Sequence, residues 1–181
     1  MILLVNGPSS AGKTSLCRAL QRSLAGSWIY LALDMWLSML ETTGTDCMPV
    51  NRGTKDEPEI EFVMSPLADE ILADMRVTAE RLARAGHDLI IDEVIWDPAI
   101  LADYRRRLDP FDLKIIAATA PIAVLTAREK ARGDRHLGAS LWQSRNMNLE
   151  TGHDWHLDTS TGGPIELAAM VADHFGLERR G

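Results

Sequence analysis

The sequence predicts an α/β protein in which helices cover both faces of a parallel β-sheet. Short apolar runs without polar alternation take turns with longer helical stretches along the whole chain. Strands that are buried on both faces have this composition, and strands that alternate with helices pair in parallel. A glycine-rich phosphate-binding motif stands between the first apolar run and the first helical stretch. Together these observations predict a single three-layer α/β/α domain over residues 1–181.

Composition is that of a soluble globular chain and argues against two classes of partner. The 181 residues are 46% hydrophobic and 25% charged, and the formal net charge is −7. An acidic chain has no general attraction to nucleic acid or to an anionic membrane, so we expect neither as a partner. Two cysteines, no signal-peptide pattern and no apolar run of membrane-spanning length predict a cytoplasmic protein. The oligomeric state does not follow from the sequence.

A phosphate-binding loop with the spacing G-x-x-x-x-G-K-[ST] runs from Gly7 to Thr14. Glycines at both ends let the backbone wrap around an anion, and the following helix N-terminus faces the same anion. Lys13 would reach the β- and γ-phosphates of a nucleotide, and the Thr14 hydroxyl would hold Mg²⁺. The predicted nucleotide contacts are Gly7, Ser9, Ser10, Ala11, Gly12, Lys13, Thr14 and Ser15.

Five apolar runs are predicted to form the strands of the sheet, at residues 2–5, 28–33, 89–91, 113–118 and 155–157. Six stretches are predicted helices, at residues 15–24, 35–40, 67–85, 98–108, 122–132 and 165–175. Glycines end the longest helix and the last one, as helix C-termini commonly require. Residues 42–58 are polar and interrupted by glycine and proline, so we expect an irregular excursion there.

Acidic side chains follow three of the predicted strands. Asp34 follows the second strand, Asp92 and Glu93 follow the third, and Asp158 follows the fifth. The carboxyl ends of parallel strands face the crevice in which such sheets bind ligands. Asp34, Asp92 and Glu93 are therefore candidate site residues, whereas a turn or a helix cap is the favoured role for Asp158.

Five segments also carry a resemblance to a known family: Ser9-Ser10-Ala11-Gly12-Lys13, Asp34, Ile91-Asp92-Glu93-Val94, Ala131-Arg132-Gly133-Asp134-Arg135 and Asp158-Thr159. They resemble motifs of chloramphenicol phosphotransferase and its relatives, which are small-molecule kinases with a nucleotide-kinase-like core. The resemblance extends over nearly the whole chain. It is weakest at residues 41–65, in the part of such kinases that holds the acceptor.

The resemblance implies a fold, a cofactor and several roles. The implied fold is that of a P-loop NTPase of the nucleotide-kinase type, with a five-stranded parallel sheet in the order 2-3-1-4-5. ATP is implied on the loop at residues 7–14, and Asp34 is implied to face the acceptor hydroxyl as the catalytic aspartate. Arg132 and Arg135 are implied to belong to a lid at about residues 128–140, and the acceptor segment would cover about residues 35–75.

Phosphoryl transfer depends mainly on positioning and on neutralising charge. Lys13, Mg²⁺ and the lid arginines would hold the oxygens of the moving group, with Arg135 as a catalytic arginine. Arg128, Arg132 and Arg135 are spaced i, i+4 and i+7, so they share a face if one helix holds all three. Arg128 either acts with them or packs on adenine, and a charged solvent-facing helix is the plain alternative.

The positions of the carboxylates and of the aromatic residues in the sequence predict their roles in the reaction. Asp34 would accept the proton of the acceptor alcohol, or only orient it, since an ordinary aspartate is a weak base. Asp92 is predicted to contact Mg²⁺ through water and Glu93 to contact the acceptor, although these two roles could be exchanged. Trp36 and Trp96 would line an apolar acceptor pocket, with ordinary core packing as the alternative.

The sequence therefore predicts an ATP- and Mg²⁺-dependent kinase that phosphorylates a hydroxyl of a small molecule. An antibiotic such as chloramphenicol is one candidate acceptor. A metabolic kinase of the shikimate, gluconate or nucleoside type is an alternative, as is a toxin-like kinase that acts on a nucleotide sugar. A nucleotide-dependent ATPase switch is a further alternative, but the chain lacks the Asn-Lys-x-Asp signature of guanine binding.

Overall fold

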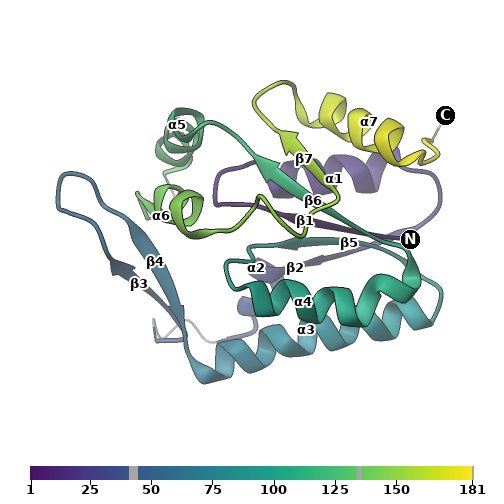
Figure 1. The fold of residues 1–181 in the computed structure, drawn as a ribbon, viewed down its shortest axis with the longest axis horizontal. Coiled ribbons are helices and arrows are strands. Elements are labelled where there is room, and N and C mark those ends of the chain that lie inside the picture. Colours follow the sequence, from purple (N-terminus) through teal and green to yellow (C-terminus); the bar gives the residue numbers. More distant parts are fainter. Residues whose placement is uncertain (41–44, 134–135, 181) are drawn as a thin grey trace.

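A five-stranded parallel sheet lies between two layers of helices in the computed structural model, which describes residues 1–40, 45–133 and 136–180 (Figure 1). The strands, in their order across the sheet, are β2 (Trp28–Ala32), β5 (Asp88–Glu93), β1 (Ile2–Asn6), β6 (Leu113–Thr119) and β7 (Trp155–Asp158). Two further strands form a separate hairpin. With those two left out of the count, the sheet has the predicted order 2-3-1-4-5.

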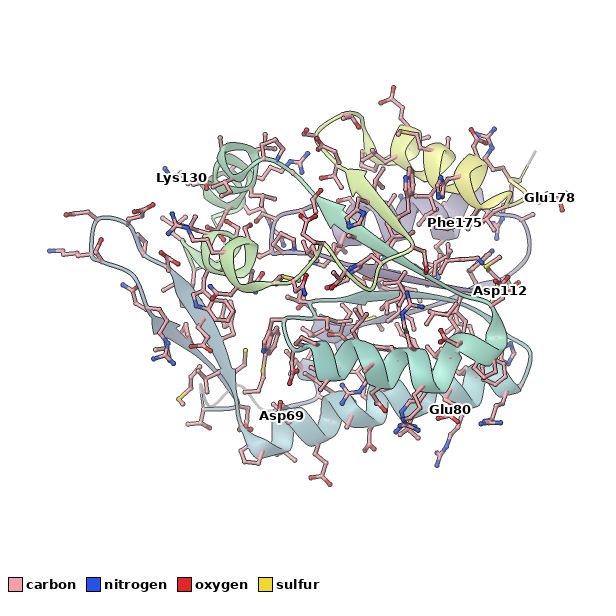
Figure 2. The ribbon with its side chains drawn as sticks, viewed as in Figure 1. Asp69, Glu80, Asp112, Lys130, Phe175 and Glu178 are labelled. Carbon is pink, nitrogen blue, oxygen red and sulfur yellow. The ribbon has the colours of Figure 1, made fainter. Side chains whose placement is uncertain are left out.

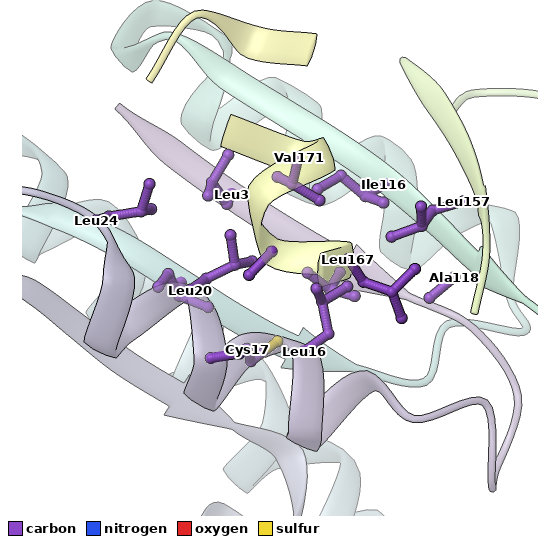
Figure 3. Close-up of a cluster of buried hydrophobic side chains, with 14 of the residues drawn as sticks. Leu3, Leu16, Cys17, Leu20, Leu24, Ile116, Ala118, Leu157, Leu167 and Val171 are labelled. Carbon is purple, nitrogen blue, oxygen red and sulfur yellow. The ribbon is translucent and has the colours of Figure 1, made fainter. Parts of the chain in front are cut away.

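The helices form two layers because alternate residues of each strand face opposite sides of the sheet. On one face, α1 (Lys13–Ser23) and α7 (Pro164–Phe175) cover Leu3 and Val5 of the central strand. Figure 3 shows this cluster, in which Leu16 and Leu20 of α1 lie close to side chains of α7. On the other face, α3 (Pro66–Arg84) and α4 (Pro98–Leu108) cover Ile2 and Leu4.

Polar contacts hold α3 and α4 together over the second face. Nη1 of Arg107 lies 2.7 Å from Oε2 of Glu80, which Figure 2 labels on α3. A second pair joins the two helices, between Nε of Arg76 on α3 and Oδ2 of Asp103 on α4 at 3.0 Å. Helix α4 begins at the predicted residue and α3 one residue before it, and the side chains of Asp97 and Ser65 are their N-caps. No helix in the described ranges is both long enough and apolar enough to cross a membrane.

The acceptor segment differs from the prediction. In place of an irregular excursion, β3 (Cys47–Asn51) and β4 (Ile60–Met64) pair antiparallel as a hairpin beyond the sheet (Figure 1). Residues 41–44 lie outside the described part of the chain. The prediction was wrong for 47–51 because these residues are half-exposed or exposed and include Pro49, so no apolar run marks a strand.

Four further helices complete the described part of the chain. Helix α2 (Leu33–Leu37) follows β2, and the 3-10 helix η1 (Asp109–Phe111) follows α4. Helix α5 (Ile122–Arg132) has its predicted bounds. Helix α6 (Ala139–Asn146) was not predicted, and it lies beside both α5 and the hairpin (Figure 1). The end of the sheet that carries the phosphate loop is therefore enclosed by α2, the hairpin, α5 and α6.

Candidate active site

The phosphate loop is built tightly against the neighbouring strand. A Cβ atom on Gly7 would lie 2.1 Å from the backbone oxygen of Ala118 in β6, so only glycine fits there. Gly12 has φ 82°, a left-handed conformation that glycine adopts without strain, and it directly precedes α1. Lys13 is buried, and its Nζ donates a hydrogen bond to the backbone oxygen of Pro8 at 3.0 Å. The amine thus lies across the loop.

Asp92 stands beside the loop because β5 pairs with β1 in a register that places Asp92 opposite Val5. Its Oδ2 accepts hydrogen bonds from the Thr14 hydroxyl at 2.7 Å and from the Tyr30 hydroxyl at 2.9 Å. Burial and the nearby Asp92 carboxylate raise the pKa of Tyr30 above its ordinary value, so Tyr30 remains a donor. The hydroxyl of Thr14 and the carboxylate of Asp92 are the hard oxygen ligands that Mg²⁺ prefers.

A cavity of about 310 Å³ connects the loop with the hairpin. One end is lined by Lys13, Thr14 and Asp92. Asp34, in the first turn of α2, lines the same cavity, as do Trp96 and residues of both hairpin strands. The predicted catalytic aspartate therefore faces the phosphate loop across one shared cavity.

A second cavity, of about 390 Å³, lies on the other side of the loop. Both cavities are bordered by Ser10, Gly12, Ser15 and Arg132, so they are two halves of one cleft. Thr159 holds Arg128 at the second cavity: Nη1 of Arg128 donates to Oγ1 of Thr159 at 3.0 Å, and Nη2 to its backbone oxygen at 2.9 Å. The cleft thus has room for a base on one side of the loop and for a second molecule on the other.

Two predicted acceptor residues do not line the first cavity. The side chain of Glu93 points to the opposite face of β5 from Asp92, where it is buried and accepts a hydrogen bond from the Tyr104 hydroxyl at 2.8 Å. Trp36 packs instead against the apolar cluster under α3 and α4. The assignment of Glu93 and Trp36 as acceptor contacts is therefore corrected, whereas Trp96 does line the cavity.

The lid arginines are only partly described. Helix α5 ends at Arg132, where Gly133 adopts φ 69°, so a continuous helix face can include Arg128 and Arg132 but does not extend further. Arg135 lies outside the described residues. Asp158 forms a turn, as predicted, in which its Oδ1 accepts from the backbone nitrogen of Ser160 at 2.8 Å.

Sequence reasoning missed three polar residues around the cleft. The Tyr30 hydroxyl donates a hydrogen bond to Asp92. The only feature of the sequence that marked Tyr30 was a polar group within a predicted apolar strand. Glu129 is 1% exposed rather than solvent-facing, and it accepts from the backbone nitrogens of Gly138 and Ser140 at 2.8 Å each. Gln143 of α6 accepts a hydrogen bond from the backbone nitrogen of Ser9 in the loop. No pattern in the sequence marked Gln143.

The chain matches a known protein family over nearly its whole length. Residues 1–176 match the model of chloramphenicol phosphotransferase-like proteins. The chain belongs to the chloramphenicol phosphotransferase-like family. Two curated relatives from Mycobacterium tuberculosis, both named as candidate O-phosphotransferases, are 26% identical to this member over 195 residues, covering 96% of this chain and 81% of each relative.

Solved structures show the same fold for this family member. The tunicamycin resistance protein of Deinococcus radiodurans superimposes with a TM-score of 0.67 at 21% identity, covering 99% of this chain and 98% of the other. A sugar kinase from a Janibacter species gives 0.68 at 17% identity, covering 97% and 94%. Shikimate kinase of Acinetobacter baumannii gives 0.58 at 14% identity, covering 96% and 92%. The fold is that of P-loop kinases, and the family and its named relatives identify the chain as a phosphotransferase with a hydroxyl acceptor.

Proposed function

We propose that this protein transfers the γ-phosphoryl group of ATP to a hydroxyl of a small molecule held in the 310 Å³ cavity. The observation that supports this proposal most is that Asp34 and the loop residues Lys13 and Thr14 line one cavity. A nucleotide on the loop would present its terminal phosphate to this cavity, because the base has room on the other side of the loop.

On the nucleotide side of the reaction, the protein supplies positively charged side chains for the phosphates and oxygen atoms for a metal ion. The Thr14 hydroxyl donates a hydrogen bond to Asp92, which leaves a lone pair on the hydroxyl oxygen for a cation. Bound Mg²⁺ would neutralise phosphate charge at this position. Lys13 and Arg132 supply further positive charge at the loop, Lys13 from its buried position across the loop. Gly7, Ser10 and the following backbone amides form the anion cradle.

The acceptor side relies on Asp34. In the transfer step the acceptor oxygen forms a bond to the γ-phosphorus, and the bond from that phosphorus to the bridging oxygen of ADP breaks. Asp34 accepts a hydrogen bond from the attacking hydroxyl and takes its proton as the new bond forms. Orientation contributes as much as basicity, since a near-attack geometry removes much of the entropic cost of the step.

The lining of the cavity favours an acceptor with an apolar body. Its lining includes apolar and sulfur-containing side chains, namely Met35, Leu37, Cys47, Phe62, Met64, Val94 and Trp96. Such a lining binds a flat or branched apolar group and leaves few polar groups to fix a hydroxyl. A phenicol-type antibiotic has this chemistry, whereas a polyhydroxylated acid such as shikimate or gluconate needs more polar partners.

An acceptor screen tests the proposal. ATP labelled in the γ-phosphate is incubated with Mg²⁺ and a panel that contains chloramphenicol, tunicamycin, shikimate, gluconate and nucleosides. We expect a labelled product with a hydroxyl acceptor that has an apolar body, and no product with the Lys13→Ala variant. ATP hydrolysis that no acceptor accelerates, with no labelled product, would instead favour an ATPase switch.

A further inference from the structure

Helix α6 places one amide side chain directly on the phosphate loop. Gln143 is 5% exposed, and its Oε1 accepts a hydrogen bond from the backbone nitrogen of Ser9. Gln143 lines the first cavity together with Lys13 and Asp34, but it does not line the second cavity. It therefore lies at the end of the loop that faces the acceptor, which is where a terminal phosphate must be for transfer.

The bond to Ser9 fixes the orientation of the amide. A backbone N–H can only donate, so the atom that meets it must be the oxygen of the Gln143 side chain, and the nitrogen must be on the other side. Within the described ranges, no oxygen accepts a hydrogen bond from this Nε2 group. Because Gln143 lines the first cavity, its two N–H donors are available to a molecule bound there.

The neighbourhood holds Gln143 in this place. The carboxylate of Glu129 accepts from the backbone nitrogens of Gly138 and Ser140 at the start of α6, with both bonds at 2.8 Å. The backbone oxygen of Gly138 in turn accepts from Ile60 of the hairpin at 3.0 Å. These contacts fix the helix from two sides, so the amide is positioned before any ligand binds, as electrostatic stabilisation of a transferred group requires.

From these contacts we infer that Gln143 is a further catalytic residue, whose Nε2 donates a hydrogen bond to an oxygen of the γ-phosphoryl group during transfer. The inference rests on the proposed function and gives the γ-phosphoryl group a neutral hydrogen-bond donor in addition to the charged Lys13. The amide adds no charge. It recognises the third phosphate of the nucleotide through a neutral donor on the side of the loop that shares a cavity with Asp34.

Binding measurements on Gln143→Glu test this role without any acceptor. The glutamate keeps an oxygen for the Ser9 N–H but replaces the donor by an anion. We expect the affinity for a non-hydrolysable ATP analogue, measured with Mg²⁺ by calorimetry, to fall by at least about tenfold, while the affinity for ADP changes by no more than about twofold. Gln143→Met, which keeps the volume but removes both polar atoms, should show a smaller loss with the same selectivity for the third phosphate.

Asn146→Asp is the matched control, because it makes the same amide-to-carboxylate change on the exposed side of the same helix. It should leave the affinities for the ATP analogue and for ADP unchanged. The melting temperature of each variant is measured as well, so that affinities are compared only among variants of similar stability. Equal losses for the ATP analogue and ADP in both Gln143 variants, or no loss in either, would overturn the inference. The Gln143 variants could lose affinity for the ATP analogue but not for ADP, while no acceptor in the screen is phosphorylated. In that case the proposed function fails, but the role of Gln143 in binding the third phosphate stands.

Discussion

The two ends of the cleft are built in different ways. The phosphate loop follows β1, in which every residue is buried, and the loop packs against the backbone of β6. The hairpin at the acceptor end has no buried residue: all five residues of β4 are half-exposed, and those of β3 are half-exposed or exposed. Its polar contacts with α6 include the Ile60–Gly138 backbone hydrogen bond and ion pairs from Arg145 to Glu57 and Glu59.

We expect the phosphate-loop end of the cleft to matter more for folding stability and the hairpin to matter more for the choice of acceptor. The buried side chains of β1 and of the helices that cover it form the apolar core, and the phosphate loop is anchored directly to this core. The hairpin contributes little apolar burial and can change its sequence at small cost in stability. We therefore expect substitutions in the hairpin to change acceptor binding at a smaller cost in stability than substitutions in the phosphate loop.

The largest expected effects come from substituting one glycine at each end of the cleft. Gly7→Ala would place a Cβ 2.1 Å from the backbone oxygen of Ala118, a buried residue of the central sheet. We expect this variant to lose about 3 kcal/mol or more of unfolding free energy, which lowers Tm by roughly 6–12 °C. Chemical denaturation and calorimetry would measure the loss.

Gly138→Ala is the matched change at the acceptor end. Its Cβ would lie 2.0 Å from the oxygen of Pro58, and Gly138 has φ 101°, so the strain is similar. Because the hairpin can shift, we expect a loss of no more than about 2 kcal/mol. Limited proteolysis should show faster cleavage within 47–64 while the rest of the chain stays intact. Equal losses of global stability in the two variants would contradict the comparison.

Glu93 supplies a pH-dependent test on the buried side. Burial raises the pKa of Glu93 to about 7 from an ordinary value of 4.5. The folded protein then binds this proton more tightly than the unfolded protein, so the free energy of unfolding falls as pH rises from 4.5 to about 7 and stays lower above that. Glu93→Gln keeps an oxygen for the Tyr104 hydroxyl and removes the titration.

We therefore expect Glu93→Gln to be more stable than the wild type at pH 8, by up to about 3 kcal/mol, and similar to it at pH 4.5. Urea denaturation at the two pH values measures the difference. If the two proteins differ by the same amount at both pH values, the Glu93 carboxylate does not carry this burial cost.

The smallest effect is expected for Arg145→Ala. Arg145 is 45% exposed and pairs with Glu57 at 3.4 Å and with Glu59, and such surface pairs contribute less than about 1 kcal/mol. The loss should appear as faster proteolysis of the hairpin at low ionic strength and should vanish at high ionic strength. Arg84→Ala, which breaks an exposed pair with Glu80 on α3, is the control and should leave hairpin cleavage unchanged.

The same division explains how much the sequence could predict. The loop and the five sheet strands follow from a spacing and from apolar runs, because buried segments leave strong patterns. The hairpin leaves none, since its strands are half-exposed and β3 contains Pro49. Helix α6 buries polar residues, including Ser140 and Gln143, so it has no apolar face that periodicity could detect.

The site was predicted in part for similar reasons. Strand alternation implies that Asp92 and Glu93 face opposite sides, but the sequence alone does not say which side faces the cleft. The pairing of Asp92 with Val5 and the burial of Glu93 against Tyr104 decide it. Asp34 could be chosen in advance because it combines a strand end with a family motif.

The most direct measurement of the central proposal is the turnover of Asp34→Asn with the acceptor found in the screen. Saturating Mg²⁺–ATP and acceptor are used, and ATP affinity is measured in parallel. The account predicts that kcat falls by about 10²–10⁴ while ATP affinity stays within about twofold of the wild type, because the amide cannot take the hydroxyl proton. Turnover that stays near the wild-type value would remove Asp34 from the reaction and contradict the account.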